Sequence, residues 1–172
     1  MRLSCTAERS LPCTPDVAFE LATNPDRFPA FFTGFGPVPG IVGIRLHSPL
    51  AVGSQRRVHS ADGTILTERV VEHDPPVRHA YTLTGFRPPM AWLVTKGEAA
   101  WTFTGHEFGS RVVWTYEFTL NKRWLAPLTT LFVHVLMRRA MHRCLKNMAR
   151  RISTCTNSVV SGASQRLFNV NS

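Results

Sequence analysis

A long amphipathic segment near the C-terminus, residues 126–152, constrains the fold more than any other part of the chain. Its apolar residues recur at three- and four-residue steps, which is the period of one face of an α-helix. Pro127 fits only in the first turn of such a helix, where its missing N–H costs nothing. At 1.5 Å per residue the helix is about 40 Å long, so the rest of the chain must supply a broad surface for its apolar stripe. The stripe consists of Leu128, Leu131, Phe132, Val135, Leu136, Met141, Leu145, Met148 and Ile152.

The other segments read mainly as strands. Residues 2–11 alternate between apolar and polar side chains, as expected of a half-buried strand. Two Pro-Asp signals then predict short helices at about 14–22 and 25–32. Six strands follow in quick succession, and the tight Asp62-Gly63 turn indicates antiparallel hairpins. They are expected at 41–47, 53–60, 64–73, 77–85, 98–103 and 112–119.

Length and composition indicate one domain. The chain has 172 residues, of which 44% are hydrophobic and 18% charged, an ordinary globular composition. We expect a single ligand-binding domain over residues 1–152. Residues 153–172 are polar and lack a sustained period, so they are expected to form a flexible C-terminal tail.

The net charge of +9 is unevenly distributed, because all 11 acidic residues lie at or before Glu117. The basic excess has two interpretations: the solvated back of the long helix, or a patch that attracts an anionic membrane surface. No nucleic-acid-binding motif accompanies it, so no nucleic acid partner is expected. The basic residues in question are Arg138, Arg139, Arg143, Lys146, Arg150 and Arg151.

Other chemistry is disfavoured. The four cysteines show no metal-ligand or CxxC spacing, and neither an HExxH motif nor a P-loop occurs, so no metal and no cofactor are expected. The N-terminus lacks a hydrophobic secretory core, and the apolar run 124–137 is shorter than the ~20 residues of a membrane span. These features predict a cytoplasmic protein, with peripheral membrane contact as an alternative.

The order of elements, with three of the segments, resembles a known superfamily. The segments are SLPCTPDVAFELATNPDRFPAFF, ERVVEHDPPVRHAYTLTG and AAWTFTGHEFGSRVVWTYEF. From Leu3 to Ile152 the sequence is similar to the START-like (SRPBCC, helix-grip) superfamily, in particular its polyketide cyclase/dehydrase and lipid-transport group. The resemblance implies an α+β helix-grip fold, in which a seven-stranded curved antiparallel sheet wraps around the long C-terminal helix and encloses a hydrophobic cavity. Members bind lipids, sterols, hormones or polyketides, and some catalyse cyclisation or aromatisation.

A cavity of this kind needs large apolar walls and a few polar groups that orient the ligand. Trp92, in a loop-rich stretch, is a candidate to gate the mouth, and Arg56 is a candidate polar group beside Val58. The alternative for the aromatic residues is that they only pack the core. The candidate wall residues are Phe28, Phe31, Phe32, Val58, Tyr81, Leu83, Trp101, Trp114, Tyr116, Leu131, His134 and Val135.

Three residues are candidates for catalysis if the cavity is an active site. Arg69 would donate hydrogen bonds to a carboxylate or a developing enolate if it faced inward. Tyr116 would help to steer that enolate, and His134 could act as an acid or base near neutral pH. The alternatives are that Arg69 is an exposed surface residue and that His134 is a histidine at the edge of the core. Glu68 and Glu117 are predicted to face outward by alternation.

Three functions are therefore left open. The first is binding of a hydrophobic small molecule, lipid or polyketide-like, in the internal cavity. The second is a cofactor-independent polyketide cyclase or aromatase activity in the same cavity. The third is a membrane-peripheral module that docks through the basic C-terminal helix and Trp124.

Overall fold

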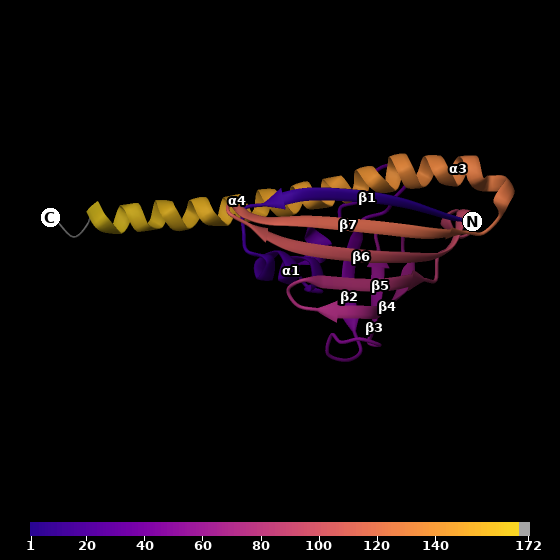
Figure 1. The fold of residues 1–172 in the computed structure, drawn as a ribbon, viewed down its shortest axis with the longest axis horizontal. Coiled ribbons are helices and arrows are strands. Elements are labelled where there is room, and N and C mark those ends of the chain that lie inside the picture. The colour runs from indigo at the N-terminus through magenta and orange to yellow at the C-terminus, as the bar shows by residue number, and fades with distance from the viewer. Residues whose placement is uncertain (169–172) are drawn as a thin grey trace.

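The computed structural model describes the backbone of residues 1–168 and the side chains of residues 1–154. Seven antiparallel strands form one curved sheet in the order β1-β7-β6-β5-β4-β3-β2, so the first and last strands of the sequence are neighbours (Figure 1). The predicted α+β class and antiparallel sheet are confirmed. The strands are β1 Arg2–Leu11, β2 Ile41–Leu46, β3 Gln55–Ser60, β4 Ile65–Asp74, β5 Arg78–Thr84, β6 Val94–His106 and β7 Gly109–Leu120.

The helices lie between β1 and β2, before β6 and after β7. A long C-terminal helix crosses the sheet beside β1, and its last turns extend beyond the sheet (Figure 1). It ends at Phe168 rather than at the predicted Ile152, and residues 169–172 of the predicted tail lie outside the described residues. The helical segments are α1 Pro15–Thr23, η1 Phe28–Ala30, α2 Met90–Leu93, η2 Arg123–Leu125, α3 Ala126–Leu131, η3 Phe132–Met137 and α4 Arg138–Phe168.

The long helix contains one wide turn. Segment η3 is a π-helix, and the Arg138 N–H donates to the Val133 carbonyl five residues earlier. This turn changes the angular position of the residues beside it, so Val133 and Met137 are buried whereas His134 is exposed. The apolar stripe predicted for a regular helix is therefore correct in α4, where Met141, Leu145 and Met148 are fully buried, but displaced in α3 and η3.

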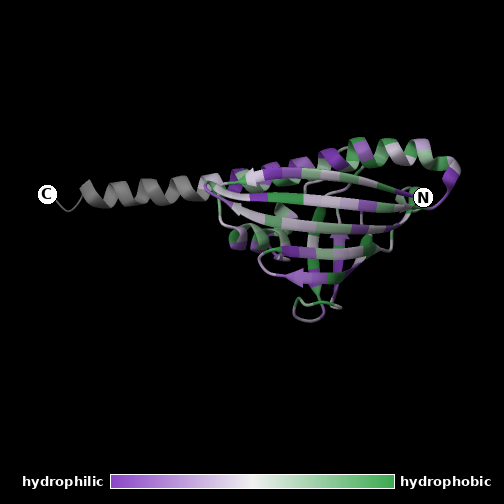
Figure 2. Cartoon of the chain, in the orientation of Figure 1, coloured by the Kyte–Doolittle hydropathy of each residue, from purple (hydrophilic) through white to green (hydrophobic). Residues whose placement is uncertain are grey.

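Aromatic rings fill the part of the core that lies against α1 and η1. Trp101 stacks on Trp114 with ring centroids 4.1 Å apart, and Phe28 meets both indoles edge-on. Such pairs add packing energy beyond their buried area. Figure 2 shows the matching pattern along the chain, in which apolar and polar bands alternate on the long strands.

Candidate functional site

The middle of the sheet is hollowed by small residues on β6. Across the sheet, Tyr81 of β5, Ala99 of β6 and Tyr116 of β7 are register partners in one row, so the two tyrosines approach each other over the small Ala99 side chain. In the next row Gly97 pairs with Phe118. A Cβ at Gly97 would lie only 2.9 Å from Cε1 of Tyr116 and would push that ring out of place. The small residues thus let the rings lie close to the sheet and leave space above them.

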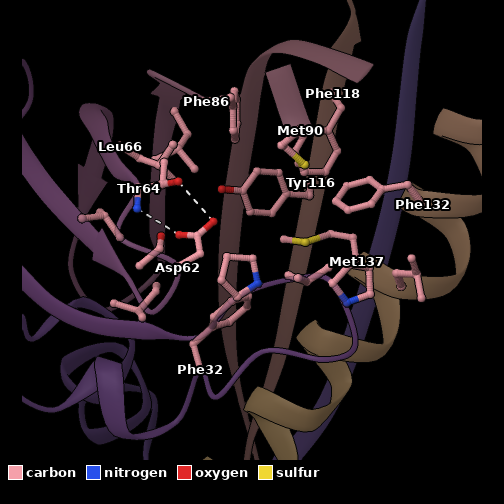
Figure 3. Close-up of a pocket in the computed structure, with 18 of the residues that line it drawn as sticks. Phe32, Asp62, Thr64, Leu66, Phe86, Met90, Tyr116, Phe118, Phe132 and Met137 are labelled. Carbon is pink, nitrogen blue, oxygen red and sulfur yellow. Dashed lines mark hydrogen bonds between the residues drawn. The ribbon is translucent and has the colours of Figure 1, made fainter. Parts of the chain in front are cut away.

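That space is a cavity of about 280 Å³ between the sheet and the α3–η3 part of the long helix. Its walls are mainly apolar, and Figure 3 shows Phe32, Phe86, Met90, Phe132 and Met137 around it. Its mouth is marked by lining residues that are also exposed. These are Pro37, Asp62, Arg87, Pro89, Leu128 and Leu131.

A buried ion pair lies at the cavity wall. Arg56 of β3 and Glu68 of β4 are register partners, and each is only 3% exposed. Arg56 Nε donates to Glu68 Oε1 at 2.7 Å, Nη2 donates to the same oxygen, and Nη1 donates to the Thr23 carbonyl at 2.9 Å. Burial raises the pKa of the Glu68 carboxyl, and the Arg56 guanidinium acts against that rise. These bonds use three of the five N–H groups of the guanidinium, and its charge is paired with Glu68, so Arg56 is held as part of the wall structure.

Two histidines extend this polar cluster toward solvent. His79 Nε2 lies 3.5 Å from Arg56 Nη2, and His79 Nδ1 lies 3.2 Å from His73 Nδ1. Burial, followed by the positive charge of Arg56, lowers the pKa of His79 to about 3. His79 is therefore neutral in the folded protein at neutral pH.

The lowered pKa of His79 predicts a pH-dependent stability. The unfolded chain binds a proton at His79 near pH 6.5 and the native protein does not, so stability present above pH 6.5 is lost as the pH falls toward about 3. We expect His79→Gln to flatten this fall by up to about 1.4 kcal/mol per pH unit. Urea unfolding between these pH values measures the slope. His47→Gln, which replaces an exposed histidine, provides the control. Equal slopes for wild type and His79→Gln would contradict the prediction.

The two tyrosines supply the hydroxyl groups of the site. Tyr81 and Tyr116 both line the cavity, and their rings meet edge to face with centroids 6.3 Å apart. Burial raises the pKa of both tyrosines, and the nearby Glu68 carboxylate raises them further. They therefore remain neutral O–H groups across the physiological range. Two hydroxyls can share at most one hydrogen bond between them, so at least one of the two protons can be donated to another acceptor.

Trp114 adds a second polar feature to the wall. Its indole Nε1 is buried and has no hydrogen-bond partner among the described residues. A buried donor without an acceptor costs free energy, so it needs a reason. Other atoms of Trp114 line the cavity, but Nε1 itself is inaccessible and is not assigned to ligand binding.

The structure places most of the candidate residues on the cavity wall. Nine of them line the cavity: Phe28, Phe32, Arg56, Val58, Tyr81, Leu83, Trp114, Tyr116 and Leu131. Their contact with a ligand stays a prediction. Phe31 and Trp101 are buried in the core and do not line it, in accordance with the core-packing alternative.

Four further candidates lie outside the cavity wall. Arg69 is exposed on the opposite face of β4, because Glu68 and Val70 occupy the inward positions. His134 is exposed and Val135 half-buried, because the π-turn places Val133 and Met137 inward instead. Arg69, Tyr116 and His134 therefore do not converge on one point. Trp92 is exposed on α2, beside the mouth.

Alternation predicted that Glu68 faces outward, and this prediction is wrong, because Glu68 is buried. Its burial is possible because Arg56 lies opposite on the neighbouring strand and neutralises it. Other wall residues, not among the candidates from the sequence, come from strands, from loops, from α2 and from the displaced helix face. They include Val38, Pro39, Ser60, Thr64, Leu66, Phe86, Met90, Leu93, Phe118, Phe132, Leu136 and Met137.

The basic residues of the long helix lie on its solvent side. Arg138, Arg143, Lys146 and Arg150 are exposed, and Arg139 stacks over Phe35 at 5.7 Å from the ring centre. Among the described residues no helix is both long and apolar enough to cross a membrane.

A curved antiparallel sheet around a long C-terminal helix, with a mainly apolar cavity between them, defines a helix-grip protein. The chain belongs to the polyketide cyclase/dehydrase and lipid transport family, whose model matches residues 2–153. This confirms the superfamily indicated by the resemblance. A search of curated protein sequences gave no match.

Solved structures show the same fold at low sequence identity. Ara h 8.0201 is 16% identical with a TM-score of 0.68, over 90% of this chain and 99% of that one. A protein of unknown function from Staphylococcus aureus, SA2116, is 14% identical with a TM-score of 0.67, over 91% and 97% of the two chains. DynU16, from the dynemicin biosynthetic locus, is 20% identical with a TM-score of 0.59, over 88% of this chain and 47% of that one.

Proposed function

We propose that the protein binds one compact apolar molecule with a single oxygen acceptor, lipid or polyketide-like, in the cavity between sheet and helix. The observation that carries the proposal is an apolar cavity lined by two neutral tyrosines, whose hydroxyl groups can donate to an acceptor on a bound molecule. The volume of about 280 Å³ lies just below the usual range of ligand pockets, roughly 300–1,000 Å³. It suits a fused-ring or short single-chain molecule better than a two-chain phospholipid.

The polar contact has a defined chemistry. Neutral hydroxyls donate well to a ketone or quinone oxygen, and a low-polarity wall strengthens such a bond. Arg56 is already bonded to Glu68 and Thr23, so a ligand carboxylate gains little from it. The cavity therefore favours an uncharged carbonyl compound over a carboxylic acid.

A matched pair of ligands tests this proposal. 9-Fluorenone and fluorene have the same ring system and differ at the carbonyl group. One good hydrogen bond predicts that wild type binds fluorenone about tenfold more tightly than fluorene. The double variant Tyr81→Phe/Tyr116→Phe is expected to bring this ratio close to one while it keeps its affinity for fluorene. Displacement of the neutral dye N-phenyl-1-naphthylamine measures both ligands, and an unchanged ratio in the double variant would refute the tyrosine assignment.

A cyclase or aromatase activity is the second candidate, and the tyrosine pair is the observation in its favour. A hydroxyl that donates to a ketone would also stabilise the enolate oxygen formed during cyclisation. The reaction further needs a base, and Glu68, the carboxylate buried in the cavity wall, is held by Arg56. Binding is therefore the function that the site supports best. Peripheral membrane contact and a cytoplasmic location stay predictions.

A further inference from the structure

An exposed apolar surface lies directly beside the cavity mouth. We call it the mouth rim and define it as Trp92 of α2, Trp124 of η2, Leu128 and Leu131 of α3, and the basic pair Lys122 and Arg123. The four apolar side chains are 61%, 74%, 53% and 54% exposed. Large apolar side chains grouped in this way mark an interaction surface more often than scattered ones do.

The mouth rim is continuous with the cavity. Trp92 and Trp124 line a second, shallow hollow of about 190 Å³. Leu93 and Leu128 line both this hollow and the cavity. A molecule that leaves the cavity past Leu128 therefore meets the two exposed tryptophans first.

Hydrogen bonds hold the two sides of the mouth rim together. Asn121 Nδ2 donates to the Ala91 carbonyl at 2.7 Å, and the Asn121 N–H donates to the Leu93 carbonyl at 2.9 Å. These bonds tie the end of β7 to α2, so Trp92 and Trp124 are presented from one connected platform. The surface is therefore formed before any partner binds.

Charge identifies the partner. Lys122 and Arg123 are exposed and form no ion pair with the described residues, and no acidic residue follows Glu117 in the sequence. Arg87 adds a third positive charge at the mouth, and Asp62, bonded to Thr64, is the acidic residue there. A second copy of the chain would bring the same basic residues and repel this surface. An anionic bilayer complements it, because tryptophan rings favour the headgroup level and cations favour anionic lipids.

We infer that the mouth rim docks on an anionic phospholipid bilayer, with the cavity mouth facing the membrane. This inference rests on the proposed ligand-binding function and adds the surface from which the ligand is taken or to which it is given. An apolar molecule then passes between bilayer and cavity without crossing water. The docking surface is the α2–η2–α3 end of the molecule and not the basic face of α4.

Vesicle binding of the purified protein tests the inference. The probe is vesicles of phosphatidylcholine containing about one third phosphatidylglycerol, compared with phosphatidylcholine alone. Wild type is expected to co-sediment with the anionic vesicles, to release as salt rises, and to show a blue shift of tryptophan emission. Trp92→Ala/Trp124→Ala and Lys122→Gln/Arg123→Gln are each expected to lower the partition coefficient at least about tenfold.

Two matched controls locate the effect. Phe108→Ala removes an aromatic side chain that is 79% exposed at the β6–β7 turn, the opposite end of these strands. Arg150→Gln/Arg151→Gln removes two exposed charges from α4. Both are expected to bind vesicles within about twofold of wild type.

The inference is overturned if wild type binds neither vesicle, if the mouth-rim variants bind like wild type, or if the α4 variant loses as much binding as they do. It is also overturned if the mouth rim instead holds two copies together in sedimentation. Dye binding without vesicles separates this result from the proposed function. Trp92 and Trp124 do not line the cavity, so their variants are expected to bind N-phenyl-1-naphthylamine like wild type whether or not docking occurs.

Discussion

Glu68→Leu is expected to lower the free energy of unfolding by about 3–5 kcal/mol, because it leaves the Arg56 guanidinium buried without its carboxylate. The double variant Arg56→Met/Glu68→Leu is expected to recover most of that loss, since apolar residues of similar size then fill the wall. Urea unfolding of the ligand-free protein at neutral pH measures both variants.

The control for this prediction is an exposed pair on the same sheet. Arg78 Nε lies 2.6 Å from Glu72 Oε2, but both side chains are more than 40% exposed. Glu72→Leu is therefore expected to change the free energy of unfolding by less than about 1 kcal/mol. If Glu68→Leu cost no more than Glu72→Leu, or if the double variant were as unstable as the single one, the buried pair would not have the structural role that we assign to it.

Val58→Trp is expected to abolish ligand binding. Val58 is 3% exposed on β3 and lines the cavity, so an indole at this position occupies the space of the ligand. The dissociation constant of N-phenyl-1-naphthylamine is expected to rise at least about 100-fold, which corresponds to a loss of ~2.7 kcal/mol. Overpacking costs about 1–3 kcal/mol of stability, and the empty cavity reduces this cost. Leu83→Trp, at a cavity-lining position on β5, is expected to give the same loss of dye binding. It replaces Val58→Trp in the test if that variant does not fold.

The matched control adds the same side chain on the other face of the same strand. Arg57 is exposed and next to Val58, so Arg57→Trp leaves the cavity unchanged. It is expected to bind the dye within about twofold of wild type. Equal dye binding by Val58→Trp and Arg57→Trp would show that the dye binds outside the cavity.

Periodicity predicted the sheet because each strand buries one face. The alternating residues of β6 and β7 required an apolar partner, which α1, η1 and the long helix supply together. The inward position of Glu68 could also have been predicted from the sequence. The turn at Asp62-Gly63 pairs His59 with Ile65 and so places Arg56 opposite Glu68, a pair that can be buried together. Alternation alone missed this, because apolar residues occur at both parities of this strand: Ile65 and Val71 are exposed, whereas Val70 is buried on the side of Glu68.

Two parts of the site depend on information that a local pattern does not carry. The π-turn at Phe132–Met137 exchanges His134 and Val135 for Val133 and Met137, and its apolar sequence FVHVLM equally suits a regular helix. The loop residues on the cavity wall, such as Val38 and Phe86, are placed by packing against distant elements. A sequence pattern indicates that such loops exist but not over which face they close.

Native mass spectrometry of the protein mixed with N-phenyl-1-naphthylamine tests most directly whether the molecule has one internal ligand site. We predict a single adduct on wild type that saturates at one dye per chain and is absent from Val58→Trp. A cavity filled by side chains would instead give either no adduct or a series of adducts that is the same in both proteins, and that result would contradict ligand binding between the sheet and the helix.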